Sequence, residues 1–396
     1  MAAHLSSPIA TADVVIIGGG VIGASIAYHL TEAGCRNVIV LERECLQGLG
    51  STGRATGGIR AQFSTPINIQ LSLASLEAIR HFKDATGVDP YYRPYGYLFL
   101  ATSDEQMQVL RTLVALQHRA GLATVRLLGP DEVRALVPQV YTDDVVGASY
   151  CPTDGFIEPL SLLKGFTERA VERGAQVWLD TEALGIELAH GVVCGVVTNR
   201  GTIATRCVVN AAGAWAKQIA RMAGIELPVE PLRRQAAGTQ PLPSLPDETP
   251  MVIELGTGFH FRKDHLGGGG VLLLWSDPAE PYGDNMYFDV SWLRRMLPLA
   301  YRRLPCLRQT QISPRRCWAG LYEVTPDHHP VLGRVPGVEG LYLANGFSGH
   351  GVMHAPATGR LLAQLILQGA ASLLDITPLS IERFARGELL AETALL

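Results

Sequence analysis

The chain has 396 residues, of which 47% are hydrophobic and 18% are charged, and its formal net charge at pH 7 is −4. This length suits more than one domain, and the composition excludes an intrinsically disordered protein, which needs low hydrophobicity and high net charge. The 33 lysines and arginines are outnumbered by 37 aspartates and glutamates and form no long basic run, so we expect no binding of nucleic acid.

The seven cysteines are dispersed along the chain and contain no C-x-x-C pair. This spacing argues against a disulfide framework, an iron–sulfur cluster and a structural zinc, and it favours a reducing compartment. Residues 1–13 lack the features of a secretory signal or a mitochondrial presequence, and no segment reads as a membrane span. We therefore expect a cytoplasmic protein.

The first predicted elements form a strand, a glycine-rich turn, a helix and a second strand. The apolar run 13–17 is typical of a strand buried on both faces of a parallel sheet. A G-x-G-x-x-G turn over 18–23 follows, and helical spacing continues through 24–32. A second apolar run, 37–41, ends in Glu42. Strands, helix, glycines and terminal acid together predict a dinucleotide-binding unit.

Each part of this unit has a physical role in binding a dinucleotide. The glycines permit a tight turn and close approach of the backbone to a pyrophosphate, and the start of the helix offers free N–H groups to phosphate oxygens. The terminal acid accepts hydrogen bonds from a ribose. The alternative is a structural glycine turn with a solvated acid. The candidate contacts in this unit are Gly18, Gly20, Val21, Ile22, Gly23, Glu42 and Arg43.

The next segment favours FAD over a nicotinamide cofactor. A nicotinamide-binding domain normally continues with alternating strands and helices. Here the second strand is followed by a loop of small residues, GSTGRATGGIR at 50–60. Such a loop suits the extended body of FAD, which must pass it towards the flavin ring.

Further elements follow in chain order. We expect helices over 65–85, 103–120 and 160–173, a strand over 91–101 and a buried strand over 206–210.

The second half of the chain contains two segments of unusual composition. Residues 228–250 contain six prolines and are predicted to form a surface crossing between domains. Residues 289–304 are predicted to form a helix, or two helices interrupted at Pro298. Its arginines most simply form a solvated face, with docking of a partner subunit as the alternative; they are Arg294, Arg295, Arg302 and Arg303.

Four stretches make the chain resemble the D-amino-acid-oxidase-like superfamily of FAD-dependent amine oxidoreductases. Within it, the chain is most similar to the branch of sarcosine oxidase, glycine oxidase, dimethylglycine dehydrogenase and the catalytic subunits of bacterial and archaeal proline and hydroxyproline dehydrogenases. The stretches are DVVIIGGGVIGASIAYHL with LERE, GSTGRATGGIRAQF, VVNAAGAWA, and TPDHHPVLG with GLYLANGFSGHGVMHAPATGRLLAQLI.

The resemblance implies an α/β fold with two interleaved domains. A Rossmann-like FAD-binding domain would comprise residues 12–86, 151–227 and 317–396. A smaller α+β substrate domain, built on a mainly antiparallel sheet, would comprise residues 87–150 and 228–316.

The resemblance also implies two catalytic candidates. The family's carboxylate-binding arginine matches Arg60, and a planar guanidinium offers two parallel bonds to a carboxylate. Its alternative role is a structural salt bridge. His350 lies in a glycine-rich loop at the start of a helix, where backbone donors can face the flavin pyrimidine edge. The other cofactor contacts implied are Ser51, Thr52, Arg54, Ala211, Gly213, Trp215, Gly346, Phe347, Ser348, Gly349, Gly351 and Val352.

Several positions depart from the family's patterns. Where some relatives attach the flavin covalently, this chain has Gly320 and Arg54, so we expect FAD to bind without a covalent bond. Met353 replaces a lysine that helps to hold the carboxylate in monomeric sarcosine oxidase. His350 and His354 are four residues apart but have no evident third ligand, so we expect no metal.

The leading hypothesis is an FAD-dependent oxidoreductase that oxidises the C–N bond of a small secondary or N-methylated amino acid. Sarcosine, proline and hydroxyproline are examples. One alternative is an FAD-dependent 2-hydroxy-acid oxidoreductase of the same superfamily, and another is a non-catalytic flavoprotein assembly factor. The sequence leaves open the substrate, the electron acceptor and the presence of a partner subunit.

Overall fold

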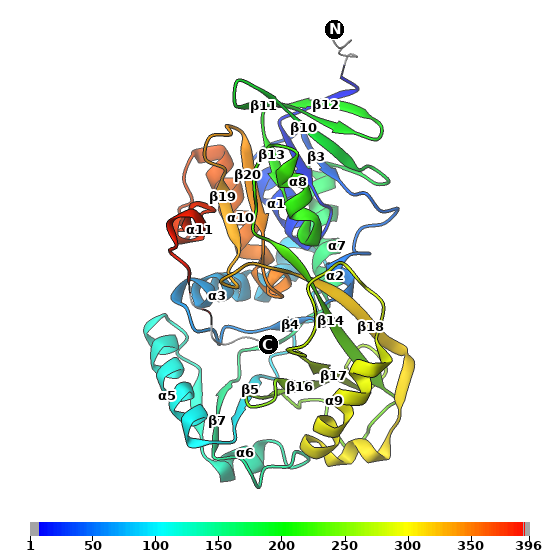
Figure 1. Cartoon of the computed structure of the whole chain (residues 1–396), viewed down its shortest axis with the longest axis vertical. Coiled ribbons are helices and arrows are strands. Elements are labelled where there is room, and N and C mark those ends of the chain that lie inside the picture. The colour runs from blue at the N-terminus through cyan, green and yellow to red at the C-terminus, as the bar shows by residue number, and fades with distance from the viewer. Residues whose placement is uncertain (1–7, 391, 393–396) are drawn as a thin grey trace.

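The computed structural model describes residues 8–390 and residue 392. Two large β-sheets dominate it, one in the upper half and one in the lower half of Figure 1. The helices are α1 (Val21–Glu32), α2 (Ser51–Arg54), α3 (Pro66–Arg80), α4 (Phe82–Thr86), α5 (Asp104–Arg119), α6 (Pro130–Leu136), α7 (Pro159–Glu172), α8 (Ala216–Arg221), α9 (Val290–Arg303), α10 (Gly351–Gln368) and α11 (Glu382–Arg386).

The upper sheet has six strands, and its pairs are parallel except for β19 with β20. All four residues of β2 and all four of β3 are buried, as expected for strands covered on both faces. The sheet order is β19 (Val331–Arg334), β20 (Leu341–Asn345), β13 (Val208–Asn210), β2 (Val14–Ile17), β3 (Val38–Leu41) and β9 (Gln176–Trp178).

Alternate residues of the upper sheet enter two different cores. Val14 and Ile16 pack with α1 and α10, whereas Val15 and Ile17 pack with α8 and a smaller sheet. This alternation follows from the two-residue period of a strand. The smaller sheet has the order β1 (Ala10–Ala12), β12 (Gly201–Thr205), β11 (Val192–Thr198) and β10 (Ala183–Ala189).

The lower sheet has eight strands, and every pair is antiparallel except β15 with β5. One face packs against α6 and α9 around Trp292 and Met296. The order is β18 (Ile312–Val324), β14 (Glu230–Thr239), β17 (Val271–Trp275), β16 (Phe259–Lys263), β15 (Met251–Glu254), β5 (Tyr97–Ala101), β7 (Gly147–Cys151) and β6 (Arg126–Leu128). A short pair, β4 (Gly58–Ile59) with β8 (Gly155–Phe156), completes the sheets.

These sheets agree with the predicted fold class, an α/β Rossmann-like part combined with a part built on a mainly antiparallel sheet. The predicted boundary at residue 317 falls inside β18, which continues in the lower sheet to Val324. Of the described helices, none is both long and apolar enough to cross a membrane.

The structure corrects several predicted elements. Residues 230–239 form the strand β14 and not a surface crossing, because their side chains pack in the lower sheet. The helix predicted over 65–85 is two helices, α3 and α4. Of the strand predicted over 91–101, only β5 forms.

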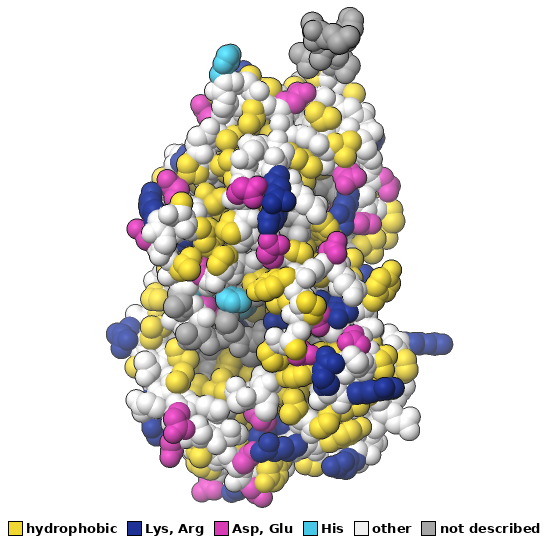
Figure 2. Space-filling model, viewed as in Figure 1, with side chains coloured by type: hydrophobic (Ala, Val, Ile, Leu, Met, Phe, Trp, Pro, Cys, Tyr) yellow, Lys and Arg dark blue, Asp and Glu magenta, His cyan; other side chains and the backbone are white. Residues whose placement is uncertain are grey.

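The helix α9 also differs from prediction. It continues through Pro298, whose side chain is exposed. Arg303 is not solvated: it is fully buried, with Glu254 at 2.6 Å and Asp144 at 2.9 Å. Arg294, Arg295 and Arg302 are exposed as predicted. In Figure 2, dark blue side chains stand among hydrophobic ones over the α9 region at the lower right.

Candidate active site

The glycine-rich turn lies where β2 ends and α1 begins. Gly18 has a φ of +115°, and a Cβ atom there would lie 2.3 Å from Ala211 O. A Cβ atom at Gly23 would lie 2.0 Å from Gly18 O, so this position serves the packing of helix on turn. Thr52 Oγ1 accepts a hydrogen bond from Val21 N at 3.1 Å and holds the loop after β3 against the start of α1.

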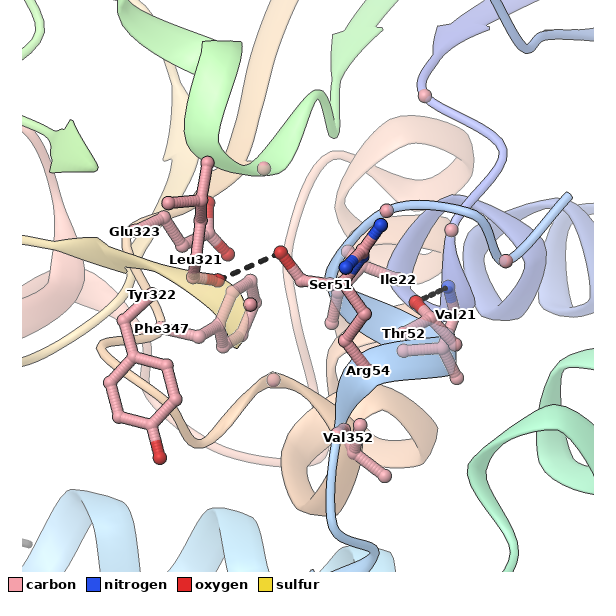
Figure 3. A pocket seen from close by; sticks show the side chains of 18 of the residues that line it. Val21, Ile22, Ser51, Thr52, Arg54, Leu321, Tyr322, Glu323, Phe347 and Val352 are labelled. Carbon is pink, nitrogen blue, oxygen red and sulfur yellow. Dashed lines mark hydrogen bonds between the residues drawn. The ribbon is translucent and has the colours of Figure 1, made fainter. Parts of the chain in front are cut away.

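One long pocket begins at this turn and reaches the lower sheet. Figure 3 shows part of it, with Ser51 and Arg54 on one side and Leu321 to Glu323 on the other. The predicted residues that line it are Gly18, Gly20, Val21, Ile22, Glu42, Arg43, Ser51, Thr52, Arg54, Arg60, Ala211, Gly213, Trp215, Phe347, Gly349, His350, Gly351 and Val352.

Three predicted residues do not line the pocket. Gly23 is enclosed by the turn itself, as described above. Gly346 packs against Thr325, and a Cβ atom there would lie 2.3 Å from Thr325 Cγ2. Ser348 adopts a φ of +51°, and its Oγ accepts a hydrogen bond from Thr325 N at 3.3 Å. Gly346 and Ser348 therefore hold the loop before α10 in place on the side away from the pocket.

The end of the pocket beside the upper sheet is lined by Glu42, Arg43 and Trp215. Glu42 Oε1 accepts a hydrogen bond from Glu44 N at 3.0 Å, and burial raises the pKa of Glu42. The Arg43 guanidinium lies 3.7 Å from the centroid of the Trp215 ring. This end therefore combines an acid with a stacked cation and an aromatic ring.

The loop around α2 is attached to β18. Ser51 Oγ donates to Leu321 O at 2.8 Å (Figure 3), and Arg54 Nη1 donates to Ala319 O at 2.9 Å. Trp318 Nε1 donates in turn to Arg54 O at 2.8 Å. Arg54 thus joins the loop to the lower sheet while also lining the pocket.

Arg60 and His350 meet in the pocket wall. Arg60 is only 2% exposed, its Nη1 donates to Gln62 O, and its Nη2 lies 3.3 Å from His350 Nε2. The guanidinium carbon is 3.9 Å from the centroid of the Phe63 ring. Burial, followed by the charge of Arg60, lowers the pKa of His350 well below its ordinary value, so the imidazole is neutral.

Glu323 lines the pocket and has one unpaired carboxylate oxygen among the described residues. Burial raises the pKa of Glu323 to about 7, opposed by the backbone N–H groups of Gly346 and Phe347. Its Oε2 is buried and has no hydrogen-bond partner among the described residues. Figure 3 shows that the side chain of Tyr322 points to the side of β18 opposite to that of Glu323.

The wall formed by the lower sheet was not predicted from the sequence. Arg234 is paired in register with Gly320, Ala236 with Trp318 and Leu232 with Tyr322. Alternation along β14 and β18 is the signal that could have found this wall, once both were recognised as strands. The lining residues added by the lower sheet and its connections are Tyr97, Arg234, Gln235, Ala236, Met251, His260, Leu274, Met286, Trp318, Gly320, Leu321, Tyr322 and Glu323.

These residues fit FAD. The glycine turn and the start of α1 suit a pyrophosphate, and the N-terminus of α10 offers unpaired N–H groups beside Gly351. The buried Glu323 Oε2 offers an acceptor that no described residue uses. A family model described as DAO, FAD dependent oxidoreductase, matches residues 13–365. The chain belongs to this family.

Individual family members are similar over nearly the whole chain. FAD-dependent oxidoreductase domain-containing protein 1 of Xenopus laevis is 34% identical, with 96% of this chain and 84% of that protein covered. Mitochondrial sarcosine dehydrogenase of Mus musculus is 30% identical, with 94% of this chain but 41% of that protein covered. The crystal structure of L-proline dehydrogenase from P. horikoshii matches with a TM-score of 0.89 and 34% identity, covering 96% of this chain and 100% of that one.

The family membership confirms the predicted enzyme class and cofactor: the protein is an FAD-dependent oxidoreductase. The roles predicted for Arg60, His350 and the individual cofactor contacts stay predictions. At Gly320, one of the two attachment positions, a Cβ atom would lie 3.0 Å from Arg54 Cβ, which leaves little room there for a larger side chain. In the described part of the chain, no cluster of three potential metal ligands occurs.

Proposed function

We propose that this oxidoreductase oxidises the C–N bond of a small secondary or N-methylated amino acid, such as sarcosine, proline or hydroxyproline. The observation that carries the proposal is the pairing of the buried Arg60 cation with the neutral His350 in the pocket wall. A buried cation favours an anionic ligand, and a carboxylate matches a guanidinium in shape. The relatives named for proline and sarcosine support this substrate class.

The apolar wall of the same pocket suits the rest of such a substrate. Met251, Leu274 and Trp318 give the wall an apolar character that matches a small ring or an N-methyl group. Burial lowers the pKa of His260 to about 4, so this second imidazole of the wall is also neutral at neutral pH. The substrate end therefore combines positive charge with apolar surface.

This electrostatic environment acts on the substrate nitrogen. The reactive form of an amine is the neutral one, because its lone pair weakens the neighbouring C–H bond. The positive charge of Arg60 beside neutral imidazoles disfavours a substrate ammonium and lowers its pKa. Bound FAD supplies the acceptor for the hydride of that C–H bond, and the imine product is then hydrolysed by water. The protein itself needs to bind the substrate, orient its C–H bond and keep its amine neutral.

The N-terminus of α10 is the group best placed to stabilise negative charge in the pocket. Gly351 and Val352 begin this helix and line the pocket, and its first backbone N–H groups have no partner within the helix. The positive end of the helix dipole adds to their effect.

An anaerobic panel of candidate substrates tests the proposal. The FAD-loaded protein is mixed with sarcosine, proline, hydroxyproline, primary amino acids and 2-hydroxy acids, and loss of the flavin absorbance is followed. We expect bleaching with secondary or N-methylated amino acids. Bleaching by 2-hydroxy acids alone would favour the hydroxy-acid alternative, and a protein that binds FAD but bleaches with none of them would be the non-catalytic alternative.

We also propose a cytoplasmic location for the protein and an electron-accepting partner. All seven cysteines are free in the structure, which is compatible with the proposed cytoplasmic location. We further propose that the reduced flavin passes its electrons to an electron acceptor or to a partner subunit. Reoxidation of the substrate-reduced flavin by oxygen, compared with an artificial acceptor, tests which kind of acceptor the protein uses.

A further inference from the structure

Two neighbouring arginines of β14 have different surroundings. Arg233 Nε lies 2.7 Å from Glu280 Oε1, and its Nη1 donates to Tyr287 O at 2.8 Å. Arg234, the next residue, points to the other face of the strand and lines the long pocket. Arg234 is half-buried.

Arg234 is incompletely paired. Its one hydrogen bond to the described residues runs from Nη1 to Arg233 O at 3.2 Å, and none of their carboxylates lies within 4 Å of it. Its Nε is buried and has no hydrogen-bond partner in the part of the chain that the structure describes. Two arginines of low exposure have carboxylate partners: Arg303 has Glu254 and Arg383 has Asp327, at 2.6 and 2.7 Å. Arg262 instead donates to the backbone oxygens of Lys263 and Thr56. Arg234 is half-buried and lines the pocket, so its guanidinium is available to an anion that binds there.

The unused atoms of Arg234 have the geometry of a carboxylate site. Nε and Nη2 lie on one edge of the guanidinium, and two parallel hydrogen bonds from this edge match the two oxygens of a carboxylate. Nη1, which is occupied, lies outside this edge. A bidentate contact would leave the bond from Nη1 to Arg233 O intact, and it requires a small movement of the pocket wall that uncovers the buried Nε.

Arg234 and Arg60 act on the same part of the pocket. After the effect of burial, the charges of both lower the pKa of His260, and both oppose the raised pKa of Tyr322. The guanidinium carbon of Arg234 lies 5.6 Å from the centroid of the Tyr322 ring. The Tyr322 ring also packs against Gly349, the neighbour of His350, where a Cβ atom would lie 2.3 Å from Tyr322 Cε2. This ring therefore lies between Arg234 and the pair of Arg60 and His350.

Arg60 has less of its guanidinium to offer. Its Nη1 is bonded to Gln62 O, its Nη2 is next to His350 Nε2, and its side chain is almost completely buried. We propose that Arg234 binds the substrate carboxylate side-on through Nε and Nη2, as a second contact beside Arg60. This inference rests on the proposed function, and it makes Arg234 a residue that selects amino acids over simple amines.

The first experiment measures ligand binding without turnover. Cyclopentanecarboxylate has the ring and carboxylate of proline but no nitrogen to oxidise, and cyclopentylmethanol is its uncharged counterpart. Both are titrated into FAD-loaded wild type, Arg234→Gln and Arg234→Lys, with the change in the flavin absorbance spectrum as readout. Arg294→Gln, which removes an exposed arginine of α9, is the control.

We expect Arg234→Gln to weaken cyclopentanecarboxylate binding about 10- to 100-fold, the size of a lost charge-assisted contact. Arg234→Lys should fall between wild type and Arg234→Gln, because it keeps the charge but loses the fork. Binding of cyclopentylmethanol, FAD content and the behaviour of Arg294→Gln should stay unchanged.

The second experiment compares the amino acid that bleaches best in the panel with the corresponding amine that lacks its carboxylate. Arg234→Gln should raise KM for the amino acid by a similar factor and leave reduction by the amine nearly unchanged. Equal losses with both substrates, or a shifted flavin reduction potential, would assign Arg234 to the cofactor and overturn the inference.

The outcomes separate this inference from the proposed function. If wild type binds cyclopentanecarboxylate and Arg234→Gln binds it equally well, the inference fails while the proposed function stands. If wild type bleaches with no amine but its carboxylate binding depends on Arg234, the proposed function fails and the anion site stands. If wild type bleaches only with amines that lack a carboxylate, both fail.

Discussion

Arg60 Nη2 lies 3.3 Å from His350 Nε2, although 290 residues separate the two in the chain. A guanidinium can only donate, so Nε2 is the acceptor and the proton of the neutral imidazole sits on Nδ1. That Nδ1 is buried and has no partner among the described residues. His350 therefore lines the pocket and keeps an unused N–H donor at Nδ1, in the tautomer that Arg60 fixes.

The first prediction concerns His350. If its Nδ1–H takes part in the reaction, His350→Ala should slow flavin reduction about 10- to 1,000-fold, the range of a lost hydrogen bond in a desolvated site. Anaerobic stopped-flow with the best substrate measures the rate. FAD content and the melting temperature should stay nearly unchanged, and an unaltered rate would make His350 a packing residue only.

The second prediction concerns the attachment of FAD. The family resemblance implies that Gly320 and Arg54 stand at the two positions used for covalent attachment, so acid or heat precipitation should release all the flavin as FAD. The flavin in the supernatant and in the pellet is quantified by absorbance. Flavin that stays with the washed, precipitated chain would contradict the prediction.

The third prediction concerns the acid at the end of β3. Glu42→Ala should weaken FAD binding by about 1–3 kcal/mol, the effect of losing a charge-assisted hydrogen bond to a ribose. Titration of the FAD-depleted protein with FAD, followed by fluorescence, measures the change. Glu77→Ala is the control, since Glu77 is an exposed acid of α3 that does not line the pocket.

The fourth prediction concerns pH and His354. Burial lowers the pKa of His354 to about 3, whereas the same side chain in the unfolded chain titrates near 6.5. Below pH 6.5 the unfolded state thus binds a proton that the folded state does not, so the free energy of unfolding falls as pH falls. This residue should account for about 1.4 kcal/mol per pH unit between pH 6 and 4.

Comparison of wild type with His354→Gln isolates this effect. Asp154 and Glu323, whose pKa values burial raises to about 6 and about 7, favour the folded state at acid pH, but they are present in both proteins. Urea unfolding at several pH values and a fixed FAD concentration should show a shallower acid loss for His354→Gln. Equal slopes would mean that His354 is protonated in the folded protein.

The segments predicted to contact FAD could be expected to line one pocket because their sequence signals are local. Gly18, Glu42 and the loop at 51–54 lie within one short stretch, where strand, turn and helix signals follow one another. The rest depends on pairing over long distances. Arg234 faces the pocket only because β14 pairs with β18, about 85 residues later, in a register that sets Arg234 beside Gly320. The prolines around β14 are typical of loops, so the sequence did not indicate a strand there.

Arg303 shows that prediction from local sequence has the same limit in the protein core. Its place next to three other arginines in 294–303 predicts a solvated face, and three of the four are exposed. Arg303 is buried because Glu254 of β15 and Asp144 lie on the side of α9 that packs against the sheet. Local periodicity cannot supply partners that are brought together by tertiary packing.

The last prediction concerns Arg60 and tests the substrate class. If its guanidinium contacts the substrate carboxylate, Arg60→Lys should lower kcat/KM for the amino acid by about 30- to 1,000-fold, or about 2–4 kcal/mol, because a lysine cannot keep the contacts with Gln62 O and His350 Nε2 while it reaches a carboxylate. Reduction by the matching amine without a carboxylate should scarcely change. Should both rates fall together, Arg60 would support His350 or the flavin instead. Combining Arg60→Lys with Arg234→Lys adds a further check, since two contacts to one carboxylate should give losses that are not additive.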